Sequence, residues 1–193
     1  MAAEKLPAFP VRHPRAFASP EQYLDWLCRR QLKGLYPLVT QGMEDRLGYE
    51  LKAIGSVGLA SWLLLLRELA TACPVRSTAL CAVGAAPGSL ACRCLGLSEV
   101  DPYRHGLLFE RFINPATPVH MHADAAASAV PGLLEYAVNV YGDQWGWSVS
   151  REGDEAVWAV APNVTVRACR QLDALALAEQ NARRPGFCTR PVR

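Results

Sequence analysis

A loop of small residues, Gly84-Ala85-Ala86-Pro87-Gly88-Ser89-Leu90, lies near the middle of the chain. The apolar run 78–83 leads into this loop and is flanked by Pro74 and Gly84, so it is predicted to be a short buried strand. Ser89 is a favoured helix N-cap residue, and a short helix is expected to begin there. The sequence therefore predicts a strand, a tight turn and a helix in immediate succession.

The segments before and after the loop carry further helix and strand signals. Ser19-Pro20-Glu21-Gln22 combines an N-cap serine, a proline at the first helical position and a capping-box glutamine, so a helix is expected over 19–33. Residues 59–71 are apolar almost all round, which predicts a central buried helix. Further helices are expected over 43–54, 107–112 and 132–141, and a strand over 119–124.

The C-terminal third has a different pattern. Residues 145–149 and 156–160 alternate in polarity and are joined by Arg151-Glu152-Gly153-Asp154, which predicts a β-hairpin. Apolar residues at helical spacing predict a helix over 166–182, and the arginine-rich segment 183–193 is expected to be a mobile tail. We expect a single α+β domain over 1–193, with helices packed on a small sheet and the hairpin plus helix at 144–182.

The composition limits the function classes. With 193 residues, 51% hydrophobic and 20% charged, the chain can bury a core and is not expected to be disordered. A net charge of +2 predicts at most weak, non-specific nucleic-acid binding. The apolar run 62–66 is far below the roughly 20 residues of a bilayer span, and no signal peptide is visible, so we expect a cytoplasmic protein without a membrane partner. Seven cysteines without CxxC spacing predict neither a disulfide framework nor a zinc ribbon.

The loop is followed by a long ordered run, Leu95-Gly96-Leu97-Ser98-Glu99-Val100-Asp101-Pro102-Tyr103-Arg104-His105-Gly106-Leu107-Leu108-Phe109-Glu110-Arg111-Phe112-Ile113-Asn114-Pro115. Together with the loop, this run closely resembles the palm of the bacterial DNA polymerase III alpha subunit, a C-family polymerase. The resemblance covers about residues 10–143 and implies a polymerase-palm-like, nucleotidyltransferase-like core. Family members also have a metallophosphatase-like domain, fingers, a clamp-binding region and an oligonucleotide-binding domain, so a truncated, degenerate homologue is expected.

In that family the glycine-serine loop holds the triphosphate of the incoming nucleotide, through backbone N–H groups that approach the phosphate oxygens. The residues that match this motif are Gly84, Gly88 and Ser89. Ala85 replaces a serine, and Pro87 removes one N–H donor. The family's preceding Arg-Gly is Ala82-Val83 here, so the resemblance implies that phosphate binding is weakened.

A larger departure concerns the metal site that the resemblance implies. After its Asn-Pro the family has a strand with alternating aspartates, Pro-Asp-x-Asp-x-Asp, two of which hold two magnesium ions for phosphoryl transfer. Ungapped counting places His122 at the first aspartate, Asp124 at the second and Ala126 at the third. Because magnesium prefers oxygen ligands, DNA synthesis is not expected.

His120, His122 and Asp124 are nevertheless spaced to project from one face of a strand. Two imidazoles and a carboxylate could bind zinc or iron, could transfer protons or orient a substrate, or could be a remnant without a role. Side chains two apart on one strand rarely converge on one ion, so no metal and no cofactor is expected. We take His122 and Asp124, with His120 behind them, as the candidate catalytic residues.

Other residues are candidates for lining a ligand site. They are Gly84, Gly88, Ser89, Tyr103, Glu110, Arg111 and Trp147. Glu110 and Arg111 fit either a solvated pair on a helix or a pocket-facing role. Trp147 fits either a cavity wall or the core face of the hairpin.

These observations favour a polymerase-derived domain that binds or converts a small molecule. Such a domain would suit bacterial specialised-metabolite biosynthesis, as a cofactor-independent cyclase or isomerase that needs shape and one proton-transfer group. The alternative is a non-catalytic accessory of replication or repair, or a decoy that binds an inhibitor of the polymerase as self-resistance. Whether the chain is an enzyme stays open at this point, since a fold does not determine a function.

Overall fold

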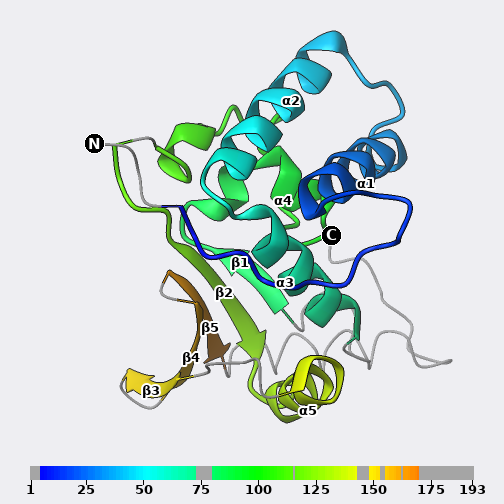
Figure 1. Ribbon diagram of the computed structural model, residues 1–193. Coiled ribbons are helices and arrows are strands. Elements are labelled where there is room, and N and C mark those ends of the chain that lie inside the picture. Colours follow the sequence, from blue (N-terminus) through cyan, green and yellow to red (C-terminus); the bar gives the residue numbers. More distant parts are fainter. Residues whose placement is uncertain are drawn as a thin grey trace, which may run out of the picture.

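The computed structural model describes residues 5–72, 80–114, 116–142, 148–152, 155–161 and 163–169. The elements in chain order are α1 (Pro20–Leu35), α2 (Gln41–Ser56), α3 (Ala60–Ala72), β1 (Leu80–Val83), the 3₁₀ turn η1 (Ala86–Gly88), α4 (Leu90–Cys94), the 3₁₀ turn η2 (Phe109–Arg111), β2 (Met121–Ala126), α5 (Val130–Tyr141), β3 (Ser148–Glu152), β4 (Glu155–Ala161) and β5 (Val164–Cys169). Helices α1 to α4 gather on one side of the molecule, and the strands lie beside them (Figure 1). The predicted α+β class is confirmed.

Local signals explain where the first three helices begin and how they pack. The Ser19 side chain accepts a hydrogen bond from the backbone N–H of Gln22 at 3.3 Å, and Thr40 caps α2 through the N–H of Met43 at the same distance. Helix α3 is buried on nearly every side, as its composition predicts, and packs against α1, β1 and α5. The predicted helices over 19–33, 43–54 and 59–71 are therefore confirmed.

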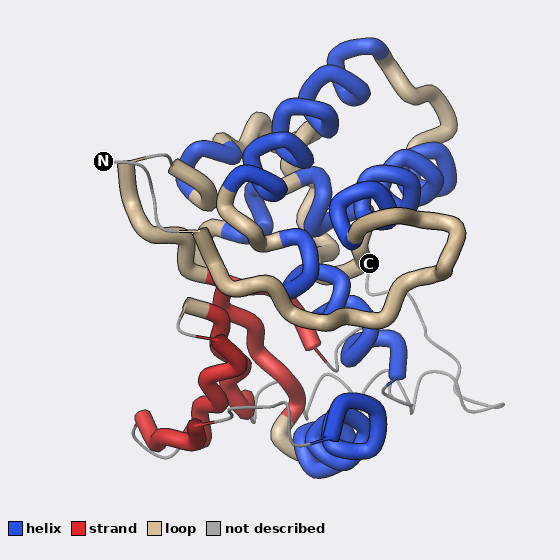
Figure 2. Tube along the Cα trace, viewed as in Figure 1, coloured by secondary structure: helices blue, strands red, loops and turns tan. Residues whose placement is uncertain are grey.

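The five strands form one mixed sheet in the order β1-β2-β5-β4-β3. Strand β2 pairs antiparallel with β1 and parallel with β5, and the other pairs are antiparallel. The strands lie together at one side of the helices (Figure 2). Seven residues of β1, β2 and β5 that alternate along the strands are at most 5% exposed and form the core face: Leu80, Ala82, Met121, Ala123, Ala125, Val164 and Val166.

The opposite face of these three strands carries the polar residues. The register places Cys81, Asp124 and Arg167 in one row across the sheet. The next row contains Val83 with two polar residues, which are His122 and Thr165. Because successive side chains of a strand point to opposite faces, the strand that fills the core also presents its polar residues together.

Two sequence predictions were wrong in part. A helix was expected over 107–112, but the structure has only the 3₁₀ turn η2, because Phe109 and Phe112 anchor the segment in the core while Leu108 has extended dihedrals. A helix was expected over 166–182, but residues 164–169 form β5, whose backbone pairs with β2 and β4. The rest of that predicted helix and the predicted tail lie outside the described residues.

The remaining expected elements are present. The strands over 78–83 and 119–124, the short helix after Ser89 and the helix over 132–141 correspond to β1, β2, α4 and α5. The hairpin is confirmed as β3 and β4, but Arg151 and Glu152, expected in the turn, belong to β3. Within the described residues, no single helix is long and apolar enough to cross a bilayer; α2 and α3, bent by 107° at their junction, meet the length and composition only as a pair.

Candidate functional site

The loop after β1 is held in shape by its own backbone. Gly84 has a φ of +70°, a left-handed conformation that side chains disfavour, and it turns the chain away from the sheet. In the 3₁₀ turn that follows, the N–H of Gly88 donates to the carbonyl of Ala85 at 3.0 Å and the N–H of Ser89 donates to Ala86 at 2.9 Å. A Cβ at Gly88 would lie 3.1 Å from the carbonyl oxygen of Leu108, so a glycine allows this close approach.

An ion pair between Arg46 and the buried Glu50 holds the end of the loop in place. Glu50 of α2 is fully buried, and its carboxylate accepts hydrogen bonds from the Ser89 hydroxyl at 2.8 Å and from the Ala91 backbone N–H at 3.0 Å. Arg46, one turn earlier, donates from Nε to Glu50 at 2.9 Å. The Glu50 carboxylate therefore contacts both the N-terminal end of α4 and the Arg46 guanidinium. These contacts compensate the free-energy cost of removing the carboxylate from water.

Arg46 also connects the loop to the segment that faces it. Its Nη2 atom donates to the carbonyl oxygens of Gly88 and Leu107, each at 2.8 Å, and Nη1 donates to Pro102 at 3.4 Å. One partly buried side chain thus sets the spacing between the two segments.

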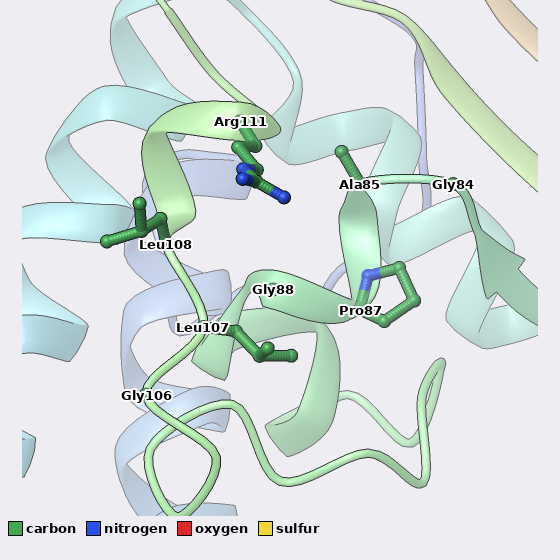
Figure 3. Close-up of a pocket in the computed structure, with 8 residues that line it drawn as sticks. All are labelled: Gly84, Ala85, Pro87, Gly88, Gly106, Leu107, Leu108 and Arg111. Atoms are coloured by element: carbon green, nitrogen blue, oxygen red, sulfur yellow. The ribbon is translucent and has the colours of Figure 1, made fainter.

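A cavity of about 520 Å³ opens between these two segments. The described residues that line it are Gly84, Ala85, Pro87, Gly88, Gly106, Leu107, Leu108 and Arg111. The side chains of Leu107 and Arg111 point toward the Ala85–Pro87 turn, whereas the side chain of Leu108 points away from it (Figure 3). Among these lining residues Arg111 carries the charge, and the other side chains are apolar or absent.

A second hollow of about 240 Å³ lies on the polar face of the sheet. Its described lining residues are Val83, Gly84, His122, Ala123, Asp124, Thr165 and Arg167. Gly84 belongs to both linings, so the two hollows meet at the end of β1. They differ in their side chains, because the second lining includes the polar side chains of His122, Asp124, Thr165 and Arg167.

The polar side chains of the second hollow are fixed in pairs. Asp124 is 8% exposed, and both of its carboxylate oxygens accept hydrogen bonds from Arg167, at 2.9 and 2.8 Å. His122 is exposed, and its Nδ1 lies 2.7 Å from the hydroxyl of Thr165. The ring of His120 stacks on that of His122, with centroids 6.0 Å apart. The face shared by these three residues agrees with their spacing, and of the two imidazoles it is that of His122 that lines the hollow.

The structure separates the other candidate site residues. Gly84, Gly88 and Arg111 line the cavity, but Ser89 is buried beneath the loop with its hydroxyl on Glu50. Tyr103 lies outside the lining, with its hydroxyl 3.5 Å from that of Thr40.

Glu110 is exposed, and Trp147 falls outside the described residues. The charge of Glu110 raises the pKa of the neighbouring Tyr49. Glu110 and Arg111 are adjacent in sequence but have different surroundings, because Arg111 faces the cavity.

Four residues of the site were missed by sequence reasoning: Arg46, Glu50, Thr165 and Arg167. The first pair carried a usable signal, since an arginine and a glutamate four apart form a helical ion pair and Glu50 lies on the apolar face with Leu47 and Ile54. Thr165 and Arg167 alternate with Val164 and Val166, a strand pattern that the helix expectation concealed.

Residues of the β2 strand do not form a metal cluster. Within the described part of the chain, no group of three or more His, Cys, Asp or Glu side chains is arranged to hold a metal ion.

Two cysteines of α4 are buried. Burial raises the pKa of the Cys92 and Cys94 thiols to about 12, so at neutral pH these two cysteines are protonated and are poor ligands or nucleophiles.

Comparison with known proteins identifies the family. The profile described as "Bacterial DNA polymerase III alpha NTPase domain" matches residues 22–147. DNA polymerase III subunit alpha of Yersinia pestis is 37% identical over 108 residues, which cover 52% of this chain and 9% of that protein. The Aquifex aeolicus subunit is 29% identical over 140 residues (67% and 12%), and the Mycobacterium tuberculosis subunit is 35% identical over 116 residues (58% and 9%). The chain thus spans about a tenth of the length of these relatives. Because the profile covers well over half of its residues, the chain belongs to the bacterial DNA polymerase III alpha family.

Proposed function

We propose that this chain binds a small organic molecule in the cavity beside the Gly84–Gly88 loop and does not synthesise DNA. The observation that carries the proposal is the lining of the cavity, whose described residues have apolar side chains or none, apart from the single guanidinium of Arg111. Ligand sites are commonly hollows of this size with mostly apolar walls and few polar groups. A ligand with an apolar body and one acidic or acceptor group matches these walls.

The state of the loop supports a ligand other than a triphosphate. A phosphate-holding loop offers several backbone N–H groups to the ligand. Here Pro87 has no N–H, and the N–H groups of Gly88 and Ser89 are bonded within the loop. The Ser89 hydroxyl is committed to Glu50. Few donors are therefore left for phosphate oxygens.

His122 extends the proposal from binding to conversion. It lies in the polar hollow that meets the cavity at Gly84, and Thr165 fixes one of its ring nitrogens. A ligand long enough to pass Gly84 would have its apolar part on Leu107 and Pro87 and a reacting group near His122. An isomerisation or cyclisation that needs shape and one proton-transfer group is the reaction class we assign, and bacterial specialised metabolism is its natural setting.

The experiment is a ligand-observed NMR screen of small aromatic and aliphatic carboxylic acids. Ala85 lines the cavity, so Ala85→Trp should block it. Ala116, which is exposed and is not part of that lining, gives the matched control Ala116→Trp. Compounds that bind the wild type and Ala116→Trp but lose at least about tenfold in affinity for Ala85→Trp would support the proposal. Binding that is unchanged in Ala85→Trp, or no binding compound at all, would contradict it.

A further inference from the structure

We infer that the guanidinium of Arg167 is the resident cation of the Asp124 carboxylate, and that it excludes a divalent metal ion from strand β2. The inference does not depend on the small-molecule proposal, because it concerns the polar face of the sheet whatever occupies the cavity. The family resemblance implies a pair of metal ions on this strand, and the residues present can be compared with what such a pair requires.

The donor set on β2 does not fit it. Two hard divalent ions in one site require several oxygen ligands, and carboxylates supply most of them in proteins. The β2 positions that project from the polar face are His122, Asp124 and Ala126, and His120 just before the strand adds a second imidazole. Two imidazoles, one carboxylate and one methyl group cannot hold two magnesium ions, which prefer oxygen ligands.

The neighbouring strands add a positive charge to this face. Asp124 is opposite Cys81 on β1 and Arg167 on β5, and His122 is opposite Val83 and Thr165. None of these four cross-strand neighbours is a carboxylate, and one is a permanent cation. The negative charge of Asp124 is therefore neutralised by the guanidinium of Arg167 in the same row.

The contact between Arg167 and Asp124 engages both oxygens of the carboxylate. Nε and Nη2 of Arg167 donate to the two different oxygens of Asp124, at 2.9 and 2.8 Å, which is the parallel two-bond geometry preferred by arginine and carboxylate. The Asp124 side chain is 11% exposed and that of Arg167 is 43% exposed, so the pair is shielded on the carboxylate side. A metal ion would have to break both bonds and then lie beside a displaced guanidinium, whose charge repels it.

The test is the titration of Mn²⁺ into the purified protein, followed by the electron paramagnetic resonance signal of the free ion. Even weak natural sites for divalent ions have dissociation constants of about 10⁻³ M. Because we expect no such site, the wild type should not bind Mn²⁺ stoichiometrically at about that concentration, and Asp124→Asn should give the same result. Wild-type binding tighter than about 10⁻⁴ M that is lost in Asp124→Asn would overturn the inference.

A gain-of-binding variant tests the role of Arg167 directly. His122→Asp combined with Arg167→Gln places two carboxylates on one strand face and removes the cation. This variant should bind Mn²⁺ at least about tenfold more tightly than the wild type, whereas His122→Asp with Arg167 intact should bind little better than the wild type. If His122→Asp alone binds as well as the double variant, Arg167 does not exclude the ion and the inference is wrong. Circular dichroism identifies any variant that fails to fold, and the wild-type titration then decides.

Discussion

Replacing Arg46 by alanine should destabilise the protein far more than removing an ordinary surface arginine. The substitution leaves the fully buried carboxylate of Glu50 without its counter-ion and removes the bonds to Gly88 and Leu107. Breaking a buried ion pair from one side costs about 3–5 kcal/mol in the free energy of unfolding. Glu50 keeps the hydrogen bonds from Ser89 and Ala91, so we expect the lower end, about 3 kcal/mol.

Arg29 provides a control, because it is also a helical arginine paired with carboxylates but lies nearer the surface. It pairs with Asp25 on α1 and with Glu44 on α2, but its side chain is 38% exposed and those of its partners are 45% and 34% exposed. Exposed pairs contribute less than about 1 kcal/mol, so Arg29→Ala should have a small effect.

Urea unfolding followed by far-ultraviolet circular dichroism measures both variants. A double-mutant cycle with Glu50→Gln should show that the effects of Arg46→Ala and Glu50→Gln are not additive, by at least about 1 kcal/mol. If Arg46→Ala costs no more than Arg29→Ala, Glu50 is not a buried charge that depends on Arg46, and our account of how the loop is supported is refuted.

Four further outcomes are expected. Purified protein should not extend a primed template with Mg²⁺ or Mn²⁺, and template-dependent incorporation that disappears in Asp124→Ala would contradict this. Binding of primed DNA, measured by fluorescence anisotropy, should be salt-sensitive and no tighter than about 10⁻⁶ M; a tight, salt-resistant complex would favour an accessory role in replication. Partial burial alone would raise the pKa of Asp101, but the N–H groups of Arg104 and Tyr103 donate to the carboxylate and lower it, so the stability that wild type has over Asp101→Asn should be full above the ordinary carboxyl pKa of about 4 and be lost as the pH falls through the lowered pKa. In native alkylation mapped by mass spectrometry, Cys81 should react before the buried Cys28, Cys92 and Cys94, and equal rates would show that these three thiols are accessible.

Sequence reasoning predicted the elements better than the contacts between them. Caps, apolar periodicity and breakers are local features, so α1, α3 and β2 could be placed from the residues themselves. The β5 strand was missed because its short alternation was outweighed by the helical spacing of the residues that follow, and because its pairing partner β2 lies about 40 residues earlier in the chain. The spacing of His122 and Asp124 predicted a shared face correctly, but it could not reveal Arg167, which reaches Asp124 from that missed strand.

The groups that hold the loop and strand β2 in place are different from the side chains that these two segments present to the hollows. The Gly84–Ser89 loop is shaped by the φ of Gly84, by its own backbone hydrogen bonds and by Glu50 underneath, none of which involves the side chains at Ala85 or Pro87 that face the cavity. Strand β2 is likewise held by its core face and by backbone pairing with both neighbours, while His122 and Asp124 alternate onto the other face. In both places the groups that determine the fold are different from the side chains that line the hollows. Substitutions of the lining side chains should therefore leave in place the contacts that hold the loop and the strand.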